Sequence, residues 1–139
     1  MPGNTTVYMS NRRFLPFVWT LDNVPASQAG KIDIGGLNTT LNEQPMPRKA
    51  SVVSLVTGLS EAITAGTMTV RLTKDGANTG DTDVLDSSSG TGSFKRFKPG
   101  VVTFNKNHNL GFRLSTNSSF APAGSIDVAV WVEVQDEAD

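Results

Sequence analysis

The sequence has no cysteine, one histidine and few charged residues among its 139 positions. The absence of cysteine excludes disulfides, thiolate metal sites and cysteine nucleophiles, and it suits a reducing cytosol or a particle assembled there. The formal net charge of −1 gives no global field that would draw the chain to nucleic acid or to a membrane surface. The sequence contains no run of about 18 apolar residues, the length needed to span a bilayer. Residues 1–11 also lack the apolar stretch of a signal peptide. We therefore expect neither nucleic acid nor membrane as a partner.

Residues that could carry chemistry are sparse. His108, the only histidine, stands between Asn107 and Asn109 in a predicted turn, whereas a Ser-His-Asp arrangement needs a buried and oriented base. In the acidic cluster that begins at Asp75, the residues Asp81, Asp83 and Asp86 lack the glycine and the distal glutamate of a calcium loop. The glutamates show no pair in an aromatic-lined cleft of the kind that glycoside hydrolysis needs. We expect a protein without enzymatic activity, metal or cofactor.

The clearest pattern is the alternation over residues 125–134. Ile126 and the four valines that end at Val134 recur at a spacing of two, which places five β-branched residues on one face of a strand. The opposite face is polar at its ends and carries Trp131 at its centre. Because a solvated face would not need a tryptophan there, we predict that this face is covered, either by the segment Phe17–Leu21 or by another subunit.

Shorter segments of the same kind recur along the chain. The stretch 51–59 fits a strand or a helix, and its β-branched residues and Gly58 favour the strand, with the helix as the alternative. Asp75-Gly76 predicts a turn, which residues 78–80 extend into a loop. Seven or more short strands, with turn clusters about every 8–12 residues, predict an antiparallel β-sandwich or jelly roll. The predicted strands are 17–21, 31–34, 51–59, 67–74, 82–85, 94–97, 101–104, 110–114 and 125–134.

Six short motifs follow one another between Met46 and Val134: Met46–Val53, Thr64–Val70, Lys74–Gly76, Val102–Lys106, Asn109–Leu114 and Phe120–Pro122. In this order they resemble the small jelly-roll domains of tailed-bacteriophage structural proteins, which are related in form to the C1q and tumour-necrosis-factor heads. Such domains occur in decoration (cement) proteins, head fibres and tail-fibre tips. Many of them have Gly-Asp where this chain has His108-Asn109. The resemblance implies a homotrimer of jelly rolls and transfers no catalytic residue.

The fold class expected is therefore all-β, an antiparallel jelly-roll β-sandwich with an extended N-terminal arm. The arm takes residues 1–16, and residues 17–139 form one β-sandwich domain whose jelly-roll core lies at about 46–135. The apolar segment from Phe14 to Trp19 lies on a neighbouring subunit or on a capsid shell, or it adds an edge strand to its own sandwich. The sequence leaves these two alternatives open.

A cysteine-free β module with neither coiled-coil heptads nor repeats favours a capsid decoration protein over a long fibre. We expect a trimer that binds the major capsid protein on the capsid surface, after assembly in the host cytoplasm. A receptor-binding fibre head or tail-fibre tip is the alternative. The cations around Phe94 and Phe97 belong to a solvated strand whose phenylalanines pack inward, or to a patch that faces an acidic protein. The expected contact residues are Arg12, Arg13, Phe14, Phe17, Trp19, Lys95, Arg96, Lys98 and Trp131.

Overall fold

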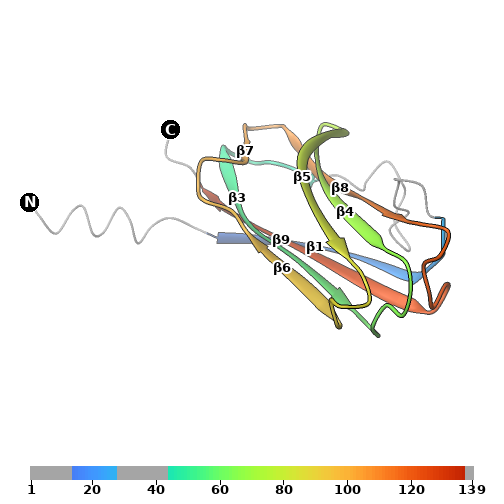
Figure 1. The fold of residues 1–139 in the computed structure, drawn as a ribbon. Helices are drawn as coiled ribbons and strands as arrows, with labels where there is room; N and C mark the ends of the chain where they lie inside the picture. Colours follow the sequence, from blue (N-terminus) through green and yellow to red (C-terminus); the bar gives the residue numbers. More distant parts are fainter. Residues whose placement is uncertain (1–13, 28–43, 137–139) are drawn as a thin grey trace, which may run out of the picture.

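A computed structural model describes residues 14–27 and 44–136, which form two antiparallel sheets that pack face to face (Figure 1). Sheet A has the strand order β1-β9-β3-β6, with β7 paired to β3, and sheet B has the order β2-β8-β4-β5. This order is that of a jelly roll, which confirms the predicted fold class. The strands are β1 (Phe14–Val24), β2 (Gln44–Pro45), β3 (Ala50–Leu59), β4 (Met68–Lys74), β5 (Ala77–Leu85), β6 (Gly92–Arg96), β7 (Thr103–Phe104), β8 (Asn109–Thr116) and β9 (Ile126–Asp136).

The core lies between the two sheets and follows the predicted alternation. All five β-branched residues of β9, from Ile126 to Val134, are buried, and β9 lies between β1 and β3. Strand β4 likewise turns the alternating apolar residues from Met68 to Leu72 inward. Trp19 from sheet A meets Phe112 from sheet B edge to face, with ring centroids 5.1 Å apart. The two sheets are thus joined through interdigitating side chains of their inner faces.

The ambiguous stretch 51–59 is strand. Strand β3 pairs with β9 on one side and with β6 and β7 on the other, so its backbone groups are satisfied laterally rather than within a helix. The register with β9 shifts between Val52 and Ser54, which leaves Val53 as an extra residue in a bulge. The bulge turns Val53 toward the outer face of sheet A.

The N-terminal segment adds an edge strand to its own sandwich, one of the two alternatives that the sequence left open. Strand β1 begins at Phe14, so residues 14–16 belong to the sheet rather than to the arm, and β1 pairs with β9 from Phe14 to Val24. Residues 1–13 of the arm and the predicted strand 31–34 lie outside the described residues.

The turn between β4 and β5 is tighter than predicted. Asp75 and Gly76 both have positive φ, at 51° and 81°, and Lys74 pairs directly with Ala77. These are the features of a two-residue hairpin turn, which lets the second strand resume at once. Residues 78–80 are therefore strand, not loop. The strand predicted at 101–104 is shorter in the structure, where β7 comprises residues 103 and 104 alone.

Candidate association face

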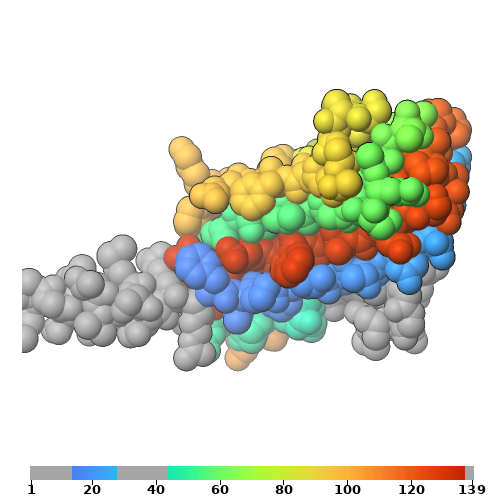
Figure 2. All heavy atoms as spheres, turned by 90° about the horizontal axis from the view of Figure 1, so that it is seen from below, coloured from blue at the N-terminus to red at the C-terminus, as the bar shows by residue number. Residues whose placement is uncertain are grey.

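The outer face of sheet A carries a row of apolar side chains across four neighbouring strands. In the register of the sheet, Val18 of β1 is opposite Trp131 of β9, Trp131 is opposite Val56 of β3, and Val56 is opposite Phe94 of β6. Val18, Trp131 and Phe94 are 48%, 49% and 58% exposed. Figure 2 shows this face with the four strands side by side, β1 in blue, β9 in red, β3 in green and β6 in yellow and orange. The row is a continuous apolar stripe open to solvent.

A second row, one pleat away, is polar and carries one charge of each sign. It runs from Pro16 through Glu133 and Ser54 to Arg96. Together the two rows border a shallow groove of about 600 Å³. The groove is lined by Phe14, Val53, Ser54, Val56, Phe94, Arg96, Phe97, Pro99, Trp131, Glu133 and Gln135.

Both charges of the second row remain available to a partner. The guanidinium of Arg96 lies 5.4 Å from the ring centroid of Phe94, a cation–π contact that holds it over the groove. Glu133 is half-buried and stands on the far side of β3 from Arg96. Within residues 14–27 and 44–136 the side chains at ion-pair distance lie elsewhere: Arg48 is near Asp136, and the ring of His108 is 4.0 Å from Asp75. The face therefore offers an apolar centre and, beside it, an anion and a cation that have no ion partner among the residues the structure describes.

One of the two covers predicted for Trp131 is wrong: the N-terminal segment does not cover the second face of β9. Strand β1 lies beside β9 in the same sheet rather than above it, so Phe17–Leu21 cannot shield the indole, which is half exposed. Backbone pairing places the segment at the sheet edge, where Phe17, Trp19 and Leu21 point toward the core. Cover by another subunit stays a prediction.

The expected contact residues Trp19 and Phe17 are not on this face. Trp19 is 7% exposed and belongs to the core, and Phe17 packs against that core with its ring centroid 6.4 Å from that of Trp19. These inward positions follow from the alternation of β1, in which Val18 takes the outer face. The alternation itself was the signal that could have identified Val18.

The basic segment near β6 divides between the two sides of the sheet. The ammonium of Lys95 donates a 2.8 Å hydrogen bond to the carbonyl of Thr82 and is thus directed at β5. Phe97 packs against the core as predicted, but Phe94 points outward, so the prediction that both phenylalanines pack inward is wrong for Phe94. Lys98 is exposed just beyond β6. Phe14 and Arg96 line the groove, whereas Arg12 and Arg13 lie outside the described residues.

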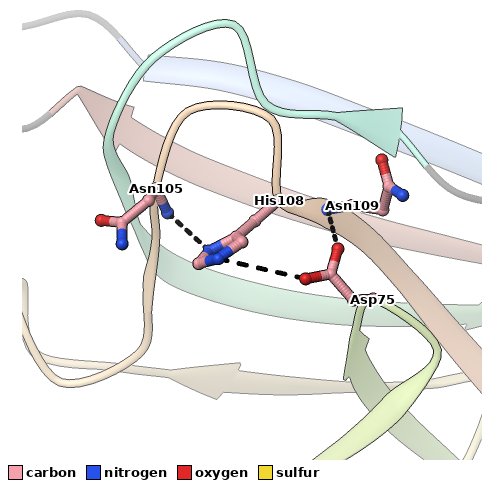
Figure 3. Close-up of polar contacts among 4 residues, drawn as sticks. All are labelled: Asp75, Asn105, His108 and Asn109. Carbon is pink, nitrogen blue, oxygen red and sulfur yellow. Dashed lines mark hydrogen bonds and ion pairs between the residues drawn. The ribbon is translucent and has the colours of Figure 1, made fainter.

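His108 fixes a turn (Figure 3). Its Nδ1 accepts the backbone N–H of Asn105 at 2.9 Å, which places the proton of the neutral ring on Nε2. That Nε2 lies 4.0 Å from Oδ2 of Asp75, whose Oδ1 accepts the N–H of Asn109 at 2.8 Å. The histidine is half-buried rather than exposed, and its contacts join the 105–108 turn to the β4–β5 hairpin. Its role is structural, because a backbone N–H occupies the nitrogen that a general base would use.

Two further observations concern metals and membranes. Among residues 14–27 and 44–136, no three histidine, aspartate or glutamate side chains gather as metal ligands would. The same part of the chain contains no helix with the length and apolarity needed to cross a membrane.

Solved structures show where this fold occurs. A chain of the capsid asymmetric unit of cyanophage Pam1 is 12% identical, with a TM-score of 0.54 over 91% of this chain and 86% of that one. A capsid chain of Helicobacter pylori bacteriophage KHP30 gives 11% identity and a TM-score of 0.48 over 89% and 92% of the two chains. The globular domain of zebrafish complement 1qA gives 9% and 0.39 over 88% and 96%. No protein-family model and no curated protein matches the sequence. The Pam1 likeness confirms the jelly roll, at the level of fold.

Proposed function

We propose that this chain is a non-enzymatic structural protein of a phage virion, a decoration (cement) protein that binds and stabilises the head. The observation that carries the proposal is the exposed apolar row Val18–Trp131–Val56–Phe94 on an otherwise well-packed jelly roll. Soluble monomers rarely leave contiguous apolar patches open to water, and those that do usually bury them against a partner. The capsid chains that share this fold make a virion the favoured setting.

In this proposal the chain acts as a homotrimer on the capsid surface and contacts the major capsid protein. A protein that binds the assembled shell and not its separate subunits stabilises the shell by mass action. Three weak contacts made together add avidity, so no single contact has to be strong. The exposed side chains of Lys98 and Phe14, with Arg12 and Arg13 in the arm, are the proposed contacts to the shell. Assembly takes place in the host cytoplasm.

Heads of the parent phage that lack this chain provide the test. Purified chain added to such heads should co-sediment with them at a fixed number of copies per particle and raise the temperature at which they release DNA. A double variant, Trp131→Ser with Phe94→Ser, should bind much more weakly. The matched control is Val84→Ser, which removes an equally exposed apolar residue from β5 in the other sheet. Binding to host cells without binding to heads would contradict the proposal and favour a receptor-binding tip.

A further inference from the structure

We propose that the outer face of sheet A packs on the same face of a second copy. The two copies are related by a two-fold axis that runs parallel to β3, directly over it and midway between the two packed faces. This inference goes beyond the proposed function, because it names the occupant of the association face. The proposed contact can be tested with the purified chain in solution, without any capsid. Its basis is the register of the sheet and the placement of two charges.

On the two sides of β3, equivalent register positions carry an aromatic residue in one row and a charged residue in the other. Val56 is opposite Trp131 on β9 and opposite Phe94 on β6, and Ser54 is likewise opposite both Glu133 and Arg96. A half-turn about an axis along β3 exchanges the positions of β9 and β6. In the resulting pair, Trp131 of each copy faces Phe94 of the other, and Glu133 of each copy faces Arg96 of the other. Val56 faces Val56 on the axis.

Other positions of the axis lose this complementarity. An axis along β9 would bring Glu133 against Glu133 of the second copy, and like charges face to face disfavour association. An axis midway between β9 and β3 would place Glu133 over Ser54 and Arg96 over Pro16, so neither charge would gain a partner. The axis along β3 is the one that joins opposite charges while it stacks aromatic on aromatic. Charge complementarity therefore selects both the second copy and its orientation.

Strand β1 forms the rim of the proposed contact. It lies two strands from β3, beyond β9, so the half-turn carries it past β6 to a position where sheet A of the partner copy has ended. Val18 is as exposed as Trp131 but would lie outside the overlap. The contact also leaves sheet B and the loops free, so trimer and shell contacts can be made elsewhere on the same molecule.

Site-directed crosslinking tests the axis, since the chain has no native cysteine. Stacked sheets lie about 10 Å apart, so a bifunctional maleimide of that span can join two thiols, one from each copy, at the centre of the contact. We expect Val56→Cys to give a covalent dimer of two chain masses on a denaturing gel, and no larger product. Val18→Cys is the control, because its two copies would be separated laterally by four strand spacings, roughly 19 Å. Failure of Val56→Cys to exceed Val18→Cys in dimer yield overturns the proposal.

Charge reversal tests the orientation independently. In the Val56→Cys background, Glu133→Arg sets two cations against each other at each contact, and Arg96→Glu sets two anions together, so each should lower the dimer yield about tenfold. An equimolar mixture of the two variants should restore the yield, since only mixed pairs place opposite charges at both contacts. A mixture no better than the separate variants contradicts the proposal. In that case capsid binding that still depends on Trp131 and Phe94 would show that the face docks on the coat protein, and the proposed function would survive.

Discussion

Trp131 and Phe94 occupy equivalent positions on either side of Val56, one on β9 and the other on β6. Both side chains are about half exposed, although each belongs to a strand of sheet A rather than to a loop tip. The jelly roll thus has a fully packed core but leaves an apolar row exposed on the outer face of sheet A. The inner face of sheet A is buried by sheet B. We propose that an assembly buries the outer apolar row.

Trp131 should contribute little to the stability of the isolated chain. Since half of its surface is already in water, Trp131→Ala should lower the free energy of unfolding by about 1 kcal/mol. The control is its chain neighbour Val130, which is 1% exposed and whose replacement by alanine should cost about 2 kcal/mol. Chemical denaturation at low protein concentration measures both. A loss of more than about 3 kcal/mol for Trp131→Ala would be that of a buried tryptophan and would contradict the open face.

Gly66 should be intolerant of any side chain. Its φ is +74°, and an added Cβ would collide with the amide of Phe120 and with Oδ1 of Asn117, which already accepts the N–H of Thr67. We expect Gly66→Ala to cost at least about 3 kcal/mol, the strain of positive φ plus the collision. Gly80 has a φ of +90° but open space around it, so Gly80→Ala should cost only about 1–2 kcal/mol. Equal losses in thermal or chemical unfolding would show that the collision is relieved.

His108 should be replaceable by an acceptor but not by alanine. His108→Ala removes the acceptor of the Asn105 N–H and should cost about 1 kcal/mol. For a chain of this size that is a fall of about 3 °C in the melting temperature. In His108→Asn the amide oxygen can take the place of Nδ1, so most of the stability should be retained. Indistinguishable melting temperatures for the two variants would contradict the acceptor role.

Asp86 should titrate below the ordinary range of an aspartate. The hydroxyl and the backbone N–H of Ser88 both donate to Oδ1 of Asp86, at 2.6 Å and 2.9 Å, and these bonds lower the pKa of the carboxyl. Because the folded pKa is depressed, the contribution to stability is present at neutral pH and is lost as the pH falls through that pKa. Ser88→Ala should raise the pKa toward its ordinary value, as followed by NMR titration. Ser87→Ala, in the same loop, is the control and should leave it unchanged.

The fold was predictable from the sequence wherever one local pattern determined the outcome. The β-branched alternation of β9 fixed its inner face, and the order of the short motifs pointed to the jelly roll. The helix–strand ambiguity of β3 could be resolved only by its lateral partners, which lie far away in sequence. The immediate restart of β5 depended on positive φ at both Asp75 and Gly76, a conformation that a turn-forming dipeptide allows but does not dictate.

The association face was less predictable, for a physical reason. Alternation assigns residues to the two faces of a strand, but it does not say whether the outer face is wet, covered by the same chain or covered by another. For Trp131 the sequence left two possible covers, and the structure excludes Phe17–Leu21, whereas cover by another subunit stays a prediction. Val56 and Glu133 escaped notice as site residues because their significance lies in cross-strand register, which a single strand pattern does not contain.

Hydroxyl-radical footprinting of Trp131 in intact particles is the most direct test of the central claim, that the outer face of sheet A is buried in the assembled virion. Trp19, the other of the two tryptophans, lies in the core and serves as the internal reference. We predict that Trp131 is oxidised readily in the dilute purified chain and is protected in the particle, while Trp19 is protected in both. Equal oxidation of Trp131 in particle and free chain, or absence of the chain from purified particles, would contradict the account.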